Sequence, residues 1–502
     1  MTKRSFTTDA LILMFAGLIV KILGFFYRIY LSNLLMAEGM GVRELITPLY
    51  SLIIITISSG ISITVSGLVS YESAKKNLAN LKRITNTAVI LAFIASSIVS
   101  TLLYIFLKDI VTYFLKDQRT LLPLLVFIPS LPFITLSSAI KGYFYGTSNV
   151  TPTAIANIVE QIVRIAGVLF LLNNMRFFSI SHALALTMVG TIISEIASLL
   201  ILFIFYKKNT SSTNACYTLS IKKIVLKILS LSSSISFNKL ITSILSTIET
   251  IYIPSRLVLS GLSWTQSVES LGKLSGMAMP LILFPSIVTN SLSTTLIPAI
   301  SEGLATNNYK SINLKISKSI CLTSSLGFIF MITFMTFSHQ ISSLIYKTTD
   351  ISSILYLLSF TSILLYLNQI LQGILNGLNE QTFSLISSTI CYGIRILFVF
   401  FVIPKYGISG FILGLILALS ISFVLNLIVI LKRTSLIIDL KNWIFKPSIV
   451  SIIMLIINKY ILSFFSILKL NTSLHTIVSV GTSIMIACFL MSLLNLANEA
   501  RI

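Results

Sequence analysis

The sequence predicts an all-α polytopic membrane protein with about fourteen transmembrane helices, arranged as two pseudo-symmetric six-helix lobes plus two C-terminal helices. Three observations predict this class. The 502 residues are 55% hydrophobic and 10% charged, whereas soluble globular chains carry about 25% charged residues. Apolar runs long enough to cross about 30 Å of hydrocarbon recur along nearly the whole chain. Motifs in the first half return in the second half at a fixed offset.

The apolar runs place the expected helices in order. The expected spans are 9–31, 45–70, 84–107, 121–143, 151–172, 181–206, 225–253, 266–297, 317–337, 351–375, 382–403, 408–431, 446–467 and 474–496. The expected domains are an N-lobe at 1–206, a cytoplasmic inter-lobe loop at 207–224, a C-lobe at 225–431 and two final helices within 446–502.

Basic residues outside the spans test this topology. With the N-terminus in the cytoplasm, most of the loop lysines and arginines fall on the cytoplasmic side along the whole chain, as the positive-inside rule expects. Both termini are therefore predicted to be cytoplasmic. The same dispersal over many short loops argues against nucleic acid as a partner, despite a formal net charge of +21.

The first span carries two cations, Lys21 and Arg28. A charge at the centre of a membrane helix costs about 2.5–3.5 kcal/mol on insertion scales, so such residues usually face a protein interior or a watery cavity. Two helical turns take about 7.2 residues, so the spacing of seven returns Arg28 to the face of Lys21. We expect a cationic stripe on this helix. The alternative is that Lys21 pairs with a neighbouring carboxylate while Arg28 reaches the headgroups.

Other charges also lie within the expected spans. The cations are Arg164, Lys239, Lys273, Arg395 and Lys459, and the acids are Glu160, Glu195, Glu249 and, near a span end, Glu269. The interior therefore has a cationic excess. Glu160 and Arg164 stand four apart, the spacing of an ion pair on one helix, and with Arg395 they are expected to be structural charges.

No feature of the sequence points to catalysis or to a cofactor. The loops are short and carry neither a carboxylate pair, nor a glycine-rich phosphate loop, nor a nucleophile with a base. The four cysteines are too far apart for a disulfide framework or a zinc spacing. We therefore expect a protein that is not an enzyme and that binds no metal.

An internal repeat links the two halves. Gly142 and Gly373, Gly146 and Gly377, and Arg164 and Arg395 are each separated by 231 positions. The repeat unit contains six helices, an even number, which predicts a parallel repeat with a cavity between the lobes. The alternative for the glycines is ordinary small-residue packing between helices.

The eighth expected span contains three prolines, at 280, 285 and 298. Such irregular backbone is tolerated in a membrane where it lines a cavity. We expect these prolines to break the helix.

These motifs resemble a known family. The stretches that carry the resemblance are 21–28 in the first span, 253–257 after the seventh, and 276–302 around the eighth. The chain resembles the polysaccharide biosynthesis and stage V sporulation protein B family of the multidrug/oligosaccharidyl-lipid/polysaccharide flippase superfamily, which is related to lipid II flippases. The resemblance covers essentially the whole chain.

The resemblance implies a transporter of the bacterial plasma membrane. Its substrate would be an undecaprenyl-pyrophosphate-linked oligosaccharide or a peptidoglycan precursor, flipped by alternating access for spore cortex or cell wall synthesis. The implied partners are the polyprenyl-linked glycan, membrane lipids and, as candidates, cell-wall synthesis enzymes. The alternatives are an ion-coupled multidrug exporter of the same superfamily and a membrane glycosyltransferase or ligase.

The resemblance also implies site residues. Cations in the first and eighth spans of lipid II flippases hold the pyrophosphate, and the matching positions here are Lys21, Arg28 and Lys273. Position 21 is lysine where many relatives have arginine, which gives a point charge in place of a bidentate fork. Some relatives bind sodium through acids in the seventh and eleventh spans. Only the seventh offers one here, Glu249, as a possible ion site.

Overall fold

The computed structural model describes residues 6–75, 77–174, 179–210, 219–467 and 472–499, and every regular element within these ranges is a helix. Nine of these helices are long and apolar enough to cross a membrane, or up to 12 if each of three bent helix pairs is one span. The all-α polytopic class is therefore confirmed. The number of fourteen spans stays a prediction, because Leu11–Ala74 runs through two of the expected spans without an intervening loop.

The chain forms two compact units, and the first contains the residues up to Leu31 and Val42–Ile251. Its helices are α1 (Phe6–Ile54), α2 (Gly60–Ala74), α3 (Leu78–Asp109), α4 (Leu121–Phe127), α5 (Ser130–Gly146), α6 (Thr151–Asn174), α7 (Ile180–Thr210) and α8 (Ile221–Val258). Short π- or 3₁₀-helical turns join some of them, at Ile55–Ser59, Ile110–Leu115 and Gln118–Thr120. Residues 32–41 of α1 and the end of α8 group with the second unit.

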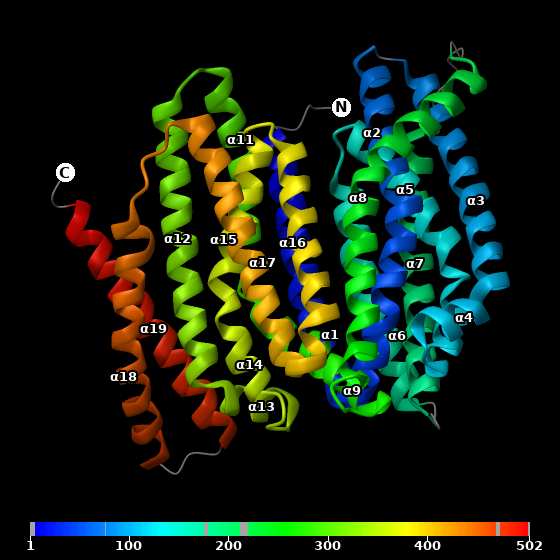
Figure 1. Cartoon of the computed structure of the whole chain (residues 1–502). Coiled ribbons are helices and arrows are strands. Elements are labelled where there is room, and N and C mark those ends of the chain that lie inside the picture. The colour runs from blue at the N-terminus through cyan, green and yellow to red at the C-terminus, as the bar shows by residue number, and fades with distance from the viewer. Residues whose placement is uncertain (1–5, 76, 175–178, 211–218, 468–471, 500–502) are drawn as a thin grey trace. The chain divides into compact units, whose positions relative to one another are not determined.

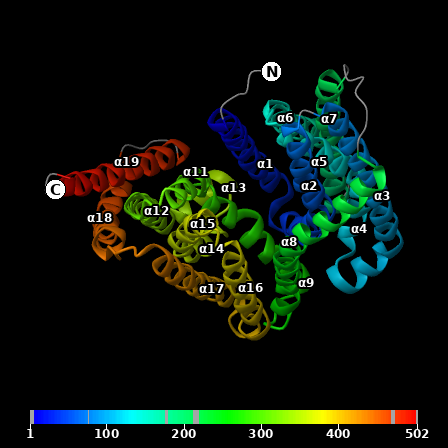
Figure 2. The same ribbon diagram turned by 90° about the horizontal axis from the view of Figure 1, so that it is seen from above.

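Helix α5 is the centre of the first unit. It contacts α2, α3 and α7, which surround it in the view from above (Figure 2). A Cβ added at Gly142 would lie 2.7 Å from the backbone oxygen of Ser62, and one at Gly146 would lie 2.6 Å from that of Ser66. The two glycines therefore let the backbones of α2 and α5 touch.

The second unit contains residues 32–41 and Tyr252–Ile502. Its helices are α9 (Trp264–Leu271), η4 (Gly272–Ala278), α10 (Met279–Leu283), α11 (Ser286–Ala305), α12 (Tyr309–Thr336), α13 (Ser338–Tyr346), α14 (Ser352–Ser359), α15 (Thr361–Gly377), α16 (Gln381–Phe401), α17 (Ile403–Thr434), η5 (Lys441–Phe445), α18 (Lys446–Ile467) and α19 (Thr472–Glu499) (Figure 1). The eighth expected span is bent by 59° between Leu283 and Ser286. The break is thus at Pro285. The expected breaks at Pro280 and Pro298 were wrong, because Pro280 lies in the first turn of α10 and Pro298 lies inside α11.

The packing of the second unit repeats that of the first. Helix α15 contacts α11, α12 and α17, as α5 contacts α2, α3 and α7. A Cβ at Gly373 would lie 2.9 Å from the oxygen of Ser293, and one at Gly377 would lie 3.1 Å from that of Ile297. Ser293 follows Ser62 by 231 positions, and Ile297 follows Ser66 by the same number. The offset seen in the sequence is therefore present in the helix contacts as well.

A reciprocal contact inside the second unit follows the same offset. A Cβ at Gly41 would clash with the backbone of Val268, and one at Gly272 would clash with that of Ala37. Val268 follows Ala37, and Gly272 follows Gly41, by 231 positions. Gly41 thus meets the equivalent of Ala37, and Gly272, the equivalent of Gly41, meets Ala37 itself. Such a reciprocal contact is typical of segments related by a two-fold axis.

The expected lobe boundary at 207–224 stays a prediction. The contacts group α8 up to Ile251 with the first unit, because Ile224 and Ile228 are buried in its core and Thr247 Oγ1 donates to the oxygen of Pro48 at 3.3 Å. These contacts show which segments pack together, but the expected boundary separates two sequence repeats. A helix that belongs to one repeat can pack with helices of the other, so the contacts do not test the boundary.

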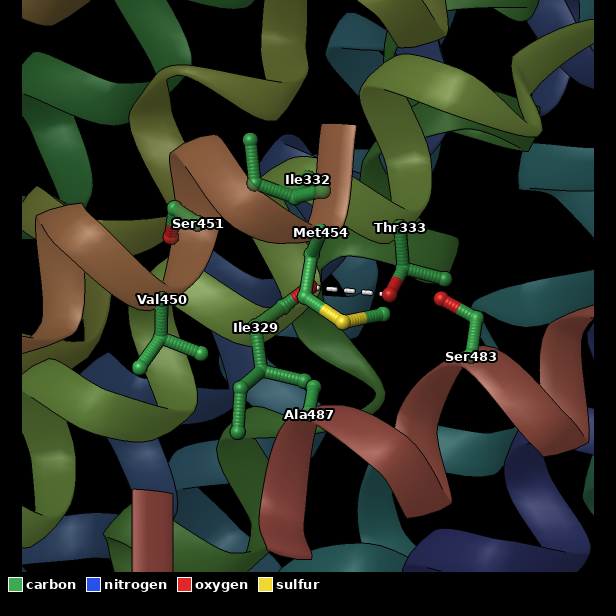
Figure 3. A pocket seen from close by; sticks show the side chains of 8 residues that line it. All are labelled: Ile329, Ile332, Thr333, Val450, Ser451, Met454, Ser483 and Ala487. Carbon is green, nitrogen blue, oxygen red and sulfur yellow. Dashed lines mark hydrogen bonds between the residues drawn. The ribbon is translucent and has the colours of Figure 1, made fainter. Parts of the chain in front are cut away.

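The last two helices, α18 and α19, pack against α12 (Figure 1). Asn458 Nδ2 donates to Thr336 Oγ1 at 3.0 Å, and Ser483 Oγ donates to Asn458 Oδ1 at 2.7 Å. A cavity of about 10 Å³ lies beside these contacts, with Thr333 and Ser483 on its wall (Figure 3). That volume holds about one water molecule, so this site is a packing feature of the three helices.

Candidate functional site

A larger cavity, of about 270 Å³, lies inside the first unit. Its walls come from α1, α6 and α7. The described residues that line it are Gly24, Tyr27, Arg28, Arg43, Ile46, Thr47, Tyr50, Gln161, Arg164, Thr187, Met188 and Thr191. Three of these are arginines, in a unit that is otherwise built from apolar helices.

Two of the arginines come from α1, on either side of a break in that helix. The backbone of Met36 is non-helical, with φ 56° and ψ −174°. Arg28 precedes the break and Arg43 follows it, yet both guanidinium groups reach the same carboxylate. Arg28 Nη2 lies 2.7 Å and Arg43 Nη1 lies 3.1 Å from Glu44 Oε1. The break therefore brings together two cations that a straight helix would hold about four turns apart.

The third arginine belongs to a network between α5, α6 and α7. Arg164 Nη2 lies 2.6 Å from Glu160 Oε1 and 3.5 Å from Glu195 Oε1. Lys141 Nζ of α5 lies 3.6 Å from the other oxygen of Glu160. The pair expected from the spacing of Glu160 and Arg164 is present, and it extends to two further helices.

The charges of this region favour an anionic ligand. In the described part of the first unit, four basic side chains (Arg28, Arg43, Lys141 and Arg164) surround three acidic ones (Glu44, Glu160 and Glu195). Ion pairs in an apolar interior pay a large desolvation cost, which good geometry only partly offsets. Guanidinium groups that border a cavity can place two parallel N–H donors on a phosphate or a carboxylate. The arrangement is suited to binding a compact polyanion.

The three residues expected to bind substrate are placed differently. Arg28 lines the cavity. Lys21 lies two turns earlier on α1 with an exposed side chain, outside the set of described residues that line the cavity. Lys273 belongs to the second unit, where its Nζ lies 2.9 Å from Glu269 Oε1 and 3.7 Å from Asp350 Oδ2. A substrate-binding role of the three stays a prediction.

The remaining expected residues lie on α8 and α16. Glu249, the possible ion site, is buried on α8. The guanidinium carbon of Arg395 lies 4.9 Å from the ring centre of Tyr392 and 5.9 Å from that of Phe411, so aromatic faces stabilise its charge. Helix α16, which carries Arg395, packs along α17. Helix α6, which carries the equivalent Arg164, packs along α7 in the same way.

The two acids of the α6–α7 network are not repeated in the second unit. Cys391 stands 231 positions after Glu160, and Asn426 stands 231 positions after Glu195. The arginine is thus present in both repeats, whereas the positions equivalent to Glu160 and Glu195 are not acidic in the second repeat.

Sequence reasoning missed Arg43 and Lys141. Arg43 lies between two expected spans and Lys141 lies at the end of the expected span 121–143, so neither was counted among the charges within the spans. The structure places Arg43 within α1 and Lys141 within α5. One sequence signal for Arg43 is the adjacent Glu44, since a neighbouring acid is an available partner for a cation that is not exposed.

Comparison with known proteins places this site in a family. A model of the family described as polysaccharide biosynthesis protein matches residues 6–304, which is more than half of the chain. The chain belongs to this family. The matched region of this polysaccharide biosynthesis protein family contains α1, α5, α6 and α7, and so the whole cavity. A second model, described as MatE, matches residues 247–401.

Two relatives and one solved structure agree with the assignment. The chain is 28% identical over 449 residues to stage V sporulation protein B of Bacillus subtilis (strain 168), covering 88% of this chain and 87% of the relative. It is 24% identical over 395 residues to lipid II flippase MurJ of the same organism, covering 74% and 72%. A structure of lipid II flippase MurJ in an inward closed conformation superposes with a TM-score of 0.71 and 18% identity over 95% of this chain and 98% of the other. This member of the polysaccharide biosynthesis protein family therefore shares the fold of MurJ.

Proposed function

We propose that this protein flips an undecaprenyl-pyrophosphate-linked oligosaccharide or peptidoglycan precursor across the bacterial plasma membrane by alternating access. The similarity to stage V sporulation protein B and to MurJ supports a flippase or transporter of this superfamily in general, and a transporter in place of an enzyme. The observation that carries the substrate class is the cavity bordered by Arg28, Arg43 and Arg164.

The chemistry of a lipid-linked glycan explains why such a cavity is needed. A pyrophosphate carries several charges and does not cross hydrocarbon unaided, since even one charge at mid-membrane is costly. A cavity of about 270 Å³ has room for a group of at least about nine non-hydrogen atoms, because about 10–15 Å³ of such volume already holds one water molecule. A diphosphate, with seven oxygens and two phosphorus atoms, is of that size. The glycan and the polyprenyl tail must then lie outside this cavity.

Lys21 and Lys273 complete the proposed path of the substrate. Lys21 shares a helix face with Arg28 and has an exposed side chain, so it can receive the pyrophosphate before or after Arg28. Lys273 has two carboxylate partners, and we propose that it exchanges them for phosphate during transport. The proposed orientation has both termini in the cytoplasm, and the proposed partners include membrane lipids and cell-wall synthesis enzymes.

An ion-coupled multidrug exporter is the second candidate. The MatE match at 247–401 and three acids that pair with the arginines of the cavity, Glu44, Glu160 and Glu195, favour it. Export of a cationic drug would need a carboxylate that is available to the drug. Glu44, Glu160 and Glu195 each lie within 3.5 Å of an arginine nitrogen. This observation supports the flippase more strongly than the exporter.

A reconstituted flipping assay tests the proposed function. Liposomes that contain the purified protein and a fluorescent polyprenyl-pyrophosphate sugar are treated with a membrane-impermeant reagent that destroys the outer-leaflet label. We expect fast loss of the inner-leaflet label with the unchanged protein. Arg28→Ala should slow this loss at least tenfold, because a charge-assisted contact to phosphate is gone. The matched control is Lys459→Ala, which removes an exposed cation of α18; equal activity of Arg28→Ala and the control would contradict the proposal.

A further inference from the structure

We infer that Glu44 is an internal competitor of the substrate's phosphate: its carboxylate occupies Arg28 and Arg43 while the site is empty, and the substrate displaces it. The inference rests on the proposed function, because it concerns the regulation of the same cavity. It assigns to Glu44 the task of keeping the substrate from binding too tightly to be released.

The geometry is that of a shared acceptor. A single oxygen of Glu44, Oε1, accepts from Arg28 Nη2 at 2.7 Å and from Arg43 Nη1 at 3.1 Å. The side chain of Glu44 is 10% exposed, while those of the two arginines are 30% and 22% exposed. The carboxylate therefore lies behind the guanidinium groups, which border the cavity with their more accessible parts.

The chemistry makes Glu44 and phosphate alternative ligands. Carboxylate and phosphate oxygens are recognised by the same planar set of guanidinium donors. In the empty site Glu44 supplies a counter-charge to both arginines, which lowers the cost of holding their charges in an apolar unit. A pyrophosphate carries more negative charge than one carboxylate, and it can therefore replace Glu44 at both arginines. When the substrate leaves, Glu44 returns to them, which lowers the free energy of the empty site and so favours release.

The second group of acids in this region is held differently. The carboxylate of Glu160 lies 2.6 Å from Arg164 Nη2 and 3.6 Å from Lys141 Nζ. With Glu195, which also pairs with Arg164, these residues come from three helices. That network holds α5, α6 and α7 together, so its ion pairs are expected to stay formed when the substrate binds. Glu44, in contrast, is the sequence neighbour of Arg43 and bonds across the break of α1 to Arg28. Its ion pair joins two parts of one helix, so its exchange for a ligand leaves the contacts between helices intact.

The test measures binding and transport with variants of the full-length protein in nanodiscs and liposomes. The binding probe is radiolabelled farnesyl pyrophosphate, a short polyprenyl pyrophosphate without glycan. Glu44→Gln keeps the shape and hydrogen-bonding capacity of the side chain but removes the charge. We expect it to bind the probe about tenfold more tightly and to release it about tenfold more slowly. In the flipping assay the same variant should reach half-maximal rate at lower substrate concentration and have a lower maximal rate.

Three further variants separate the possible failures. Glu302→Gln makes the same charge change at an exposed position of α11 and should leave both readouts unchanged. Arg28→Ala should lose probe binding; if it binds as the unchanged protein does, the proposed function itself is wrong. If Arg28→Ala loses binding but Glu44→Gln binds no tighter, the competitor role is overturned and the proposed function stands. Glu44→Asp, which keeps the charge on a shorter side chain, should show an intermediate affinity and guards against a folding defect in Glu44→Gln.

Discussion

Arg28 shows how one residue serves two demands of a membrane protein. Its charge lies within an apolar unit, where the carboxylate of Glu44 at 2.7 Å stabilises it. Its side chain is still 30% exposed and borders the cavity. A residue held only for stability would be fully enclosed by its partner, so the retained access to the cavity is the feature that favours ligand binding.

The exposed side chain of Lys21 leads to a prediction at this scale. If Lys21 contacts the pyrophosphate, Lys21→Ala should reduce flipping at least tenfold with normal membrane insertion, since removal of a charge within a span favours insertion. Lys21→Arg should keep activity, because guanidinium binds phosphate at least as well as ammonium. Lys21→Glu should be the most damaging variant, because it repels the substrate. The measurement is the flipping assay, together with the amount of protein in the membrane.

The control for Lys21 is again the exposed Lys459 of α18. Full activity of a well-expressed Lys21→Ala variant would remove Lys21 from the site. A different outcome, in which Lys21→Ala lowers the amount of protein while a second acid-to-neutral change restores it, would assign Lys21 to an ion pair.

At the scale of elements, the central helices α5 and α15 are positioned by glycines. Each has two glycines four positions apart, and each lies against a neighbour at backbone contact distance. Such close approach lets side chains bond across the contacts. Ser138 Oγ of α5 donates to the oxygen of Ser58, in the π-helical turn before α2, at 2.8 Å, and Ser293 Oγ of α11 donates to the oxygen of Gln369 in α15 at 3.0 Å. In an apolar solvent these contacts replace the hydrophobic effect as the force between helices.

A glycine substitution tests this packing. A Cβ at Gly373 would lie 2.9 Å from the oxygen of Ser293 and 3.0 Å from its Cβ, so Gly373→Ala must push α11 and α15 apart. We expect a loss of about 1–3 kcal/mol of stability, as for other overpacked cores. The measurement is the thermal unfolding midpoint in detergent.

The matched control lies on the next helix. A Cβ at Gly393 of α16 would have nothing within 4 Å. Gly393→Ala should therefore be neutral or stabilising by up to about 1 kcal/mol, the difference in helix propensity between the two residues. Equal midpoints for the two variants would show that the close contact of α11 and α15 carries no packing constraint.

At the scale of the whole molecule, the prediction concerns orientation in the membrane. Basic residues concentrate in the loops expected to be cytoplasmic, at 71–83, 207–224, 298–316 and 432–445. In a variant without native cysteines, Ser220→Cys should resist an impermeant thiol reagent added to intact cells. Thr349→Cys, in a loop expected to lie outside, should react. Both side chains are exposed in the structure, so access to the reagent depends only on the side of the membrane. Ready labelling at position 220 would refute the predicted topology.

The sequence by itself determined the helical class, the expected spans, the repeat offset of 231 and the presence of cations in the first span. These follow from local properties, because the length and hydropathy of a run decide whether it can lie in a membrane as a helix. The expected spans fall almost entirely within helical segments of the described chain, although 9–31 and 45–70 share one continuous helical stretch, Leu11–Ala74. A break in the eighth span was predictable because proline removes a backbone donor, but its place at Pro285, and not at Pro280 or Pro298, came from the structure.

Only the tertiary structure decided which charges meet. Arg43 joins Arg28 because α1 breaks at Met36, a residue whose identity gives no sign of a positive φ. Lys141 reaches Glu160 because the rotation of α5 about its axis points that side chain toward α6. Hydropathy fixes neither the rotation of a helix nor the place of such a break, because both depend on the packing of neighbouring helices. The cavity and the shared carboxylate of Glu44 are therefore properties of the packed unit and cannot be read from any single span.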